Sequence, residues 1–162
     1  MKKKEDGVDL LSECLPAPQQ KQLTKSQLIP APDTPITQCP CSFSIDTEEG
    51  KAMVIKGMGE PDLTFNDNGI CEVAVVHFMI HPIKTTNPDT GEESDATRFV
   101  FFDAKGLTFA TTSVVVPNRL VALLQLYPPE RWKRGLRLIF SQRLSRKTKR
   151  IYHDVSVIPE TT

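Results

Sequence analysis

The amino-acid sequence predicts a mainly β protein, a small five-stranded barrel with one α-helix between the third and fourth strands. Three observations support this prediction. After residue 50, most segments alternate apolar and polar residues, the pattern that places successive side chains on opposite faces of a strand. One segment has apolar residues at helical spacing instead. Hydrophobic residues make up 39% of the 162 residues, which is enough for the core of a single domain.

Residues 1–44 are expected to form a disordered, Pro-rich arm, and residues 45–162 the folded domain. Six prolines stand in this arm among Gln, Lys, Thr and Ser: Pro16, Pro18, Pro30, Pro32, Pro35 and Pro40. Each proline removes a backbone donor and fixes φ, so neither a helix nor a sheet propagates through the segment.

A strand, a long strand and a strand hairpin are expected before the helix, as the first three main strands of the barrel. Residues 51–56 form a plausible first strand that ends at two glycines. Residues 70–84 are apolar on both faces, so we expect a long strand that bends and serves two sides of a barrel. Residues 97–103 and 107–113 flank the turn Ala104-Lys105-Gly106 and form a hairpin.

The helix and the last two strands follow. Pro117 suits the first helical position, and apolar residues at 116, 120, 123, 124 and 127 share one helical face. Pro128-Pro129 end the helix. The stretch GLRLIFSQRLSRKTKRIYHDVSVI, residues 135–158, alternates on both sides of a basic turn and predicts a second hairpin.

The charges are segregated although the net charge is zero. Residues 119–150 contain ten Lys or Arg and one acid, Glu130, whereas residues 46–95 contain eleven Asp or Glu and three Lys. The protein therefore has a basic C-terminal half and an acidic middle, and a ligand of either sign would meet a local field.

The order of these elements resembles the oligonucleotide-binding (OB) fold of single-stranded DNA-binding proteins from phages and mobile elements. The resemblance covers roughly residues 50–158. Three stretches carry it: ATRFVFFDAKGLTFATT before the helix, VPNRLVALLQLY as the helix, and LRLIFSQRLSRKTKRIYHDVSV after it. The resemblance implies sequence-tolerant binding of single-stranded DNA in replication or recombination, in the cytoplasm of a bacterial or phage-infected cell.

The basic turn at residues 145–150 is the clearest functional signal, because it holds four cations and no acid. Single-strand binding uses cations to follow the phosphates and aromatic side chains to stack on bases. The candidate phosphate contacts are Arg137, Arg143, Arg146, Lys147, Lys149 and Arg150. The candidate stacking residues are Tyr152, Trp132, Phe102 and Phe65. The competing interpretation is that the turn is a solvated loop and that the aromatic residues pack in the core.

A catalytic, metal or cofactor site is not expected. The sequence contains no nucleophile elbow, no phosphate-binding glycine loop and no paired-carboxylate motif. Cys39, Cys41, His77 and His81 suggest zinc, but His77 and His81 lie four residues apart on a strand, about 13 Å, too far to share one ion. We therefore predict a binding module and not an enzyme.

Alternative ligands remain open at this point. Single-stranded RNA fits the same residues, and the basic hairpin could also enter a duplex groove. The main alternative is a protein-interaction or structural module, in which the acidic surface of one copy meets the basic surface of another without nucleic acid. No run of about 18 apolar residues occurs, so no membrane partner is expected. A homo-oligomer and a protein partner from replication or recombination are both compatible with the sequence.

Overall fold

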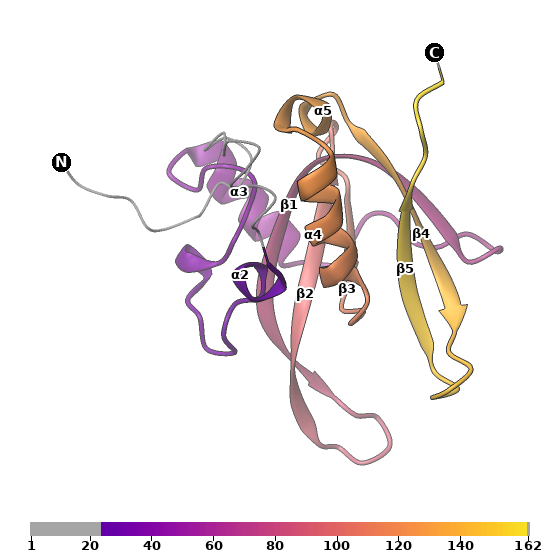
Figure 1. Cartoon of the computed structure of the whole chain (residues 1–162). Coiled ribbons are helices and arrows are strands. Elements are labelled where there is room, and N and C mark those ends of the chain that lie inside the picture. Colours follow the sequence, from indigo (N-terminus) through magenta and orange to yellow (C-terminus); the bar gives the residue numbers. More distant parts are fainter. Residues whose placement is uncertain (1–23, 162) are drawn as a thin grey trace.

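The computed structural model describes residues 24–161, which contain one five-stranded antiparallel sheet (Figure 1). The strands are β1 (Ile70–Thr86), β2 (Glu93–Asp103), β3 (Thr108–Thr111), β4 (Leu136–Leu144) and β5 (Ile151–Val157). Their order across the sheet is β3-β2-β1-β4-β5. The helical segments are α2 (Lys25–Leu28), η1 (Ile36–Gln38), α3 (Glu48–Gly57), α4 (Val116–Leu126) and α5 (Pro129–Lys133). None of the helices within residues 24–161 is long and apolar enough to cross a membrane.

Strand β1 organises the sheet because it pairs with a different strand along each half. Its first part, from Ile70 to Val75, pairs with β4, and its second part, from Val75 to Thr86, pairs with β2. The register with β2 shifts between Val75 and His77, and such an irregularity bends a strand. The long strand that the sequence predicts is confirmed, and it continues to Thr86.

Two helices connect β3 to β4, where the sequence analysis expects one. Helix α4 is the predicted helix, with Pro117 in its first turn and Leu120, Leu123 and Leu124 buried. Helix α5 follows at once. Helix α4 ends at Leu126, and Pro128, just after the C-cap Tyr127, cannot continue it because proline lacks the backbone N–H that a helix interior needs. Pro129 is the first residue of α5, where proline is tolerated.

Residues 51–56 belong to helix α3, so the strand predicted there is wrong. Thr47 caps the helix: its side-chain oxygen accepts a hydrogen bond from the Gly50 N–H at 2.9 Å. Glu48 in the first turn and Lys56 in the last turn have the charges that complement the helix dipole. Gly57 lets the helix approach the sheet, because a Cβ there would lie 2.6 Å from the Met79 sulfur.

The folded part begins earlier than the predicted boundary at residue 45. Leu28 is buried in the main core, and Phe43 is buried in a second one. Cys41 forms a β-bridge with Met79, and the Ser42 hydroxyl accepts a hydrogen bond from the Phe78 N–H at 2.8 Å. The remainder of the predicted arm, residues 1–23, lies outside the described residues.

The two cores occupy opposite faces of the sheet because neighbouring strand residues point in opposite directions. Phe101 belongs to the main core, together with the buried face of α4. Phe102, the next residue, belongs to the second core with Phe43 and Met79. Partly buried residues of α3 pack on that second core. The described chain is therefore mainly β, with short helices on both faces of the sheet.

Candidate nucleic-acid interface

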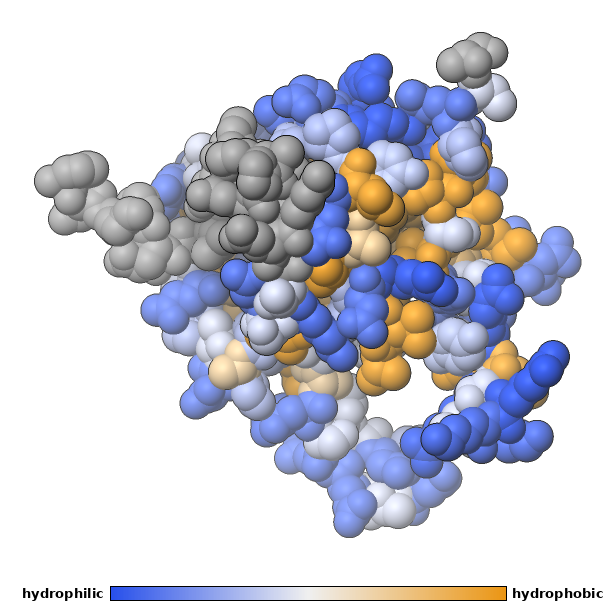
Figure 2. Space-filling view, in the orientation of Figure 1, coloured by the Kyte–Doolittle hydropathy of each residue, from blue (hydrophilic) through white to orange (hydrophobic). Residues whose placement is uncertain are grey.

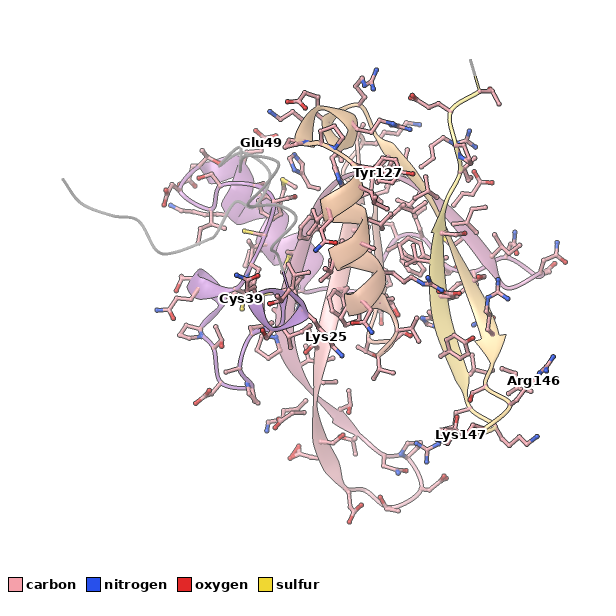
Figure 3. The ribbon with its side chains drawn as sticks, in the orientation of Figure 1. Lys25, Cys39, Glu49, Tyr127, Arg146 and Lys147 are labelled. Carbon is pink, nitrogen blue, oxygen red and sulfur yellow. The ribbon has the colours of Figure 1, made fainter. Side chains whose placement is uncertain are left out.

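The turn between β4 and β5 presents its cations to solvent. Two backbone hydrogen bonds close the turn: the Ser145 N–H donates to the Arg150 carbonyl oxygen, and the Lys149 N–H donates to the Ser145 carbonyl oxygen, each at 2.9 Å. Lys149 has a φ of 60°, a left-handed conformation that tightens the turn. Arg146 and Lys147 lie at the tip of the hairpin and project away from the body of the protein (Figure 3).

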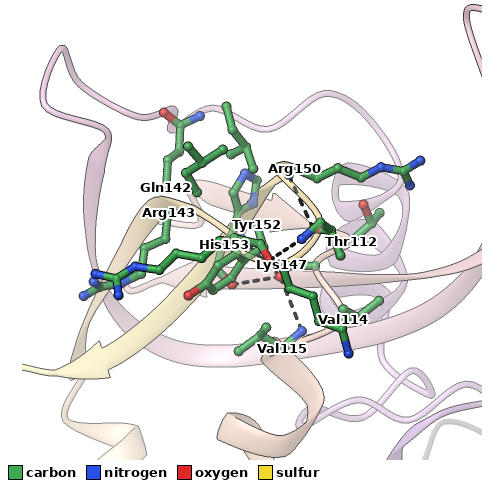
Figure 4. Close-up of a pocket in the computed structure, with 15 residues that line it drawn as sticks. Thr112, Val114, Val115, Gln142, Arg143, Lys147, Arg150, Tyr152 and His153 are labelled. Atoms are coloured by element: carbon green, nitrogen blue, oxygen red, sulfur yellow. Dashed lines mark hydrogen bonds between the residues drawn. The ribbon is translucent and has the colours of Figure 1, made fainter.

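A groove of about 1220 Å³ lies beside this turn, and we call it the basic groove (Figure 4). Residues 112–115, 142–148 and 150–153 line it. One wall is the connection between β3 and α4, and the other is the β4–β5 hairpin. Arg143, Arg146, Lys147 and Arg150 are among the lining residues, and no Asp or Glu is.

Three cations of the basic groove are available to a ligand. Arg143 is partly neutralised, because its Nε lies 3.5 Å from Asp154 Oδ2, and the same carboxylate also pairs with Arg119 at 3.0 Å. Arg146, Lys147 and Arg150 are exposed and form no ion pair within residues 24–161. No carboxylate of the described residues therefore neutralises their positive charge.

Exposed aliphatic side chains accompany these cations. Val114, Leu144 and Ile151 line the groove and are 79%, 64% and 66% exposed. Leu144 and Ile151 are direct partners across the β4–β5 ladder, so they form one apolar patch. The sequence analysis missed these residues. A signal existed, because Leu144 continues the apolar alternation of β4 beyond Phe140.

His153 connects the two walls of the basic groove. Its Nδ1 lies 2.7 Å from the Thr111 hydroxyl. The Ser113 hydroxyl donates to the His153 carbonyl oxygen at 2.8 Å and accepts from the His153 N–H at 3.2 Å. Burial lowers the pKa of His153 below its ordinary value, which favours the neutral ring. These contacts fix the position of the hairpin relative to the end of β3.

Tyr152 lines the groove, as expected for a stacking candidate, and is half-buried. It faces Arg143 across the ladder, on the opposite face of the hairpin from Leu144 and Ile151. Both faces of the hairpin thus contribute to the groove.

Two other stacking candidates are core residues, so the prediction for them is wrong. Trp132 and Phe102 are both 0% exposed. Trp132 packs against Phe78 with ring centroids 5.8 Å apart, and Phe102 packs against Phe43 at 5.6 Å. A base could reach neither ring without opening the core. Helix α5 buries Trp132, although its neighbours Lys133 and Arg134 are exposed.

The remaining candidates lie outside the groove lining. Phe65 is half-buried and contacts the rings of Phe109 at 5.3 Å and His153 at 4.7 Å, so it supports the groove from behind. Arg137 is exposed on β4 and pairs with Glu72 at 2.9 Å. Lys149 belongs to the basic turn but not to the groove lining.

The structure within residues 24–161 contains no group of three or more His, Cys, Asp or Glu side chains that could hold a metal ion. Burial raises the pKa of Cys39 to about 11, so this thiol is protonated at neutral pH. No protein-family model matches the chain, and no curated protein or solved structure matches it either.

Proposed function

We propose that this protein binds single-stranded DNA with little preference for base sequence. One observation carries the proposal: the basic groove combines three cations that lack an ion pair within the described residues with exposed aliphatic side chains and Tyr152. Phosphates would contact Arg146, Lys147 and Arg150. Unstacked bases would cover the apolar patch and stack on the tyrosine ring. A duplex offers the same phosphates, but its bases are paired, so the apolar side chains would stay in water.

The domain that carries this groove is proposed to be an OB-like barrel. The strand order β3-β2-β1-β4-β5, with helices between β3 and β4, supports this proposal. Closure would bring the two edge strands together. The hydrogen bonds of Thr111 and Ser113 with His153 support it, since they join the end of β3 to β5. The proposed role in replication or recombination, in a bacterial or phage-infected cytoplasm, is based on the sequence resemblance.

The test is a comparison of single-stranded and duplex ligands. Fluorescence anisotropy with a labelled oligo-dT of about 30 bases and a duplex of equal length gives both affinities over a salt series. We expect the single strand to bind more tightly than the duplex. The triple variant Arg146→Ala, Lys147→Ala, Arg150→Ala should lower the slope of log K against log salt by about 2, because each lost phosphate contact removes about 0.7 for single strands.

A matched variant controls for net charge. Lys105, Lys133 and Arg134 are also exposed, and they form no ion pair within residues 24–161 and lie outside the basic groove. Changing these three residues to Ala should leave the salt slope near the wild-type value. Equal effects of the two triple variants, or equal affinity for single strand and duplex, would refute the proposal.

A further inference from the structure

The outer part of the β1–β2 hairpin projects from the body of the protein (Figure 1). We call residues 84–95 the acidic arm. It contains four acids, Asp89, Glu92, Glu93 and Asp95, and one cation, Lys84, which pairs with Asp95. Residues 86–95 are all exposed, and no residue of the arm belongs to either hydrophobic core. Strand pairing nevertheless continues to Thr86 and Glu93.

Local contacts order this arm: strand pairing, the Lys84–Asp95 ion pair and the hydrogen bonds of its turn. The Asn87 side-chain oxygen accepts from the Asp89 N–H at 2.8 Å, and the Asn87 N–H donates to the Glu92 carbonyl oxygen at 2.8 Å. A two-stranded hairpin without a packed face is only marginally stable in water. Clustered carboxylates repel one another and weaken it further. A cationic partner at the tip would relieve this repulsion.

The basic groove has the charge that complements the acidic arm, but the arm and the groove of one molecule do not pair with each other within the described residues. No ion pair joins the acidic arm to the β4–β5 hairpin in the described part of the chain. Both hairpins project toward the same side of the molecule with an open gap between them, and mainly hydrophilic residues cover their outer ends (Figure 2). The carboxylates of the arm and the cations of the groove are therefore both available to another molecule.

We propose that the acidic arm of one copy binds in the basic groove of a second copy. The carboxylates of Asp89, Glu92 and Glu93 would contact Arg146, Lys147 and Arg150. Each copy would offer a different surface to each neighbour, so the contact is head to tail and extends beyond a dimer. The inference uses the groove of the proposed function but does not require it to bind nucleic acid. If both proposals hold, phosphates and arm carboxylates compete for the same cations.

The test is a complementation between two variants, made without nucleic acid. The arm variant carries Asp89→Asn, Glu92→Gln and Glu93→Gln, and the groove variant carries Arg146→Ala, Lys147→Ala and Arg150→Ala. Analytical ultracentrifugation measures self-association at about 20 mM and about 500 mM salt, where screening of exposed charges differs strongly. Wild-type protein should self-associate at low salt only. Each variant alone should associate at least about tenfold more weakly.

An equimolar mixture of the two variants should form a heterodimer, because one copy retains the arm and the other retains the groove. A control variant with Asp33→Asn, Glu60→Gln and Glu130→Gln removes the same charge from exposed sites outside the arm, and it should associate like wild type. Monomeric wild-type protein at low salt, or no heterodimer in the mixture, would overturn the inference. Oligonucleotide binding by such a monomer would leave the proposed function standing, whereas heterodimers without such binding would refute only the proposed function.

Discussion

Changing Ser113 to Ala is expected to lower the free energy of unfolding by about 2 kcal/mol. The Ser113 hydroxyl forms hydrogen bonds with both backbone groups of His153, at 2.8 Å and 3.2 Å, and together with the Thr111 hydroxyl it joins the end of β3 to β5. A hydrogen bond contributes about 1 kcal/mol net, so the loss of the two bonds to His153 gives about 2 kcal/mol. The hydroxyl also accepts from the Val115 N–H, but at 3.4 Å this long bond adds little. Because the site is half-buried, water can reach the freed groups and limit the loss.

The assay is urea unfolding followed by the fluorescence of Trp132, the one tryptophan of the chain, which is fully buried. Ser156→Ala is the matched control. Ser156 lies on β5, the strand of His153; it is exposed, and its hydroxyl has no hydrogen bond within the described residues. Its loss should stay within about 0.5 kcal/mol. A Ser113→Ala loss no larger than that of Ser156→Ala would refute the argument that Ser113 holds the edge strands together.

Two further predictions concern the aromatic residues and pH. Trp132→Ala should lower the free energy of unfolding by about 3–5 kcal/mol, because it leaves a cavity; Tyr152→Ala should change stability little but weaken single-strand binding by about 1–3 kcal/mol for each stacked base. A larger stability loss for Tyr152→Ala than for Trp132→Ala would reverse these assignments. The pKa values of His81 and His153 are lowered, mainly by burial, so the folded state prefers both rings neutral. The stability from this preference is full above the unfolded pKa of about 6.5 and is lost as pH falls through the folded pKa values. The melting temperature should therefore drop as the pH falls below about 6.5, and His153→Gln should reduce the drop; an unchanged pH profile in that variant would contradict this assignment.

Long periodic segments were predictable because they repeat one signal over many residues. The strand from Ile70 and the helix from Val116 are both confirmed. The strand predicted at residues 51–56 was wrong, because six residues of mixed apolar character fit the period of a helix and of a strand equally well. The Thr47 cap and the two acids after it were the better guide.

The solvent exposure of the basic turn could be predicted from the sequence because it depends on local composition. Residues 145–150 contain four cations without an acid, and a turn so charged stays in water. The exposure of Arg146 and Lys147 follows from their own chemistry and needs no distant contact. The same argument covers the acidic tip of the β1–β2 hairpin, with its Asn-Pro and Thr-Gly turn residues.

The composition of the groove depended on contacts between distant segments. Trp132 has cationic neighbours in the sequence, yet helix α5 buries its ring against Phe78, which lies 54 positions earlier in the chain. Leu144 continues the buried face of β4, yet the core ends before it and leaves it exposed beside Val114 and Ile151. The sequence by itself thus determined the long strand β1, the two hairpins, helix α4 and the charged turns, since local periodicity and local charge decide these. Only the tertiary structure decided which side chains those elements bury and which they leave exposed in the groove, because burial depends on what packs against each face.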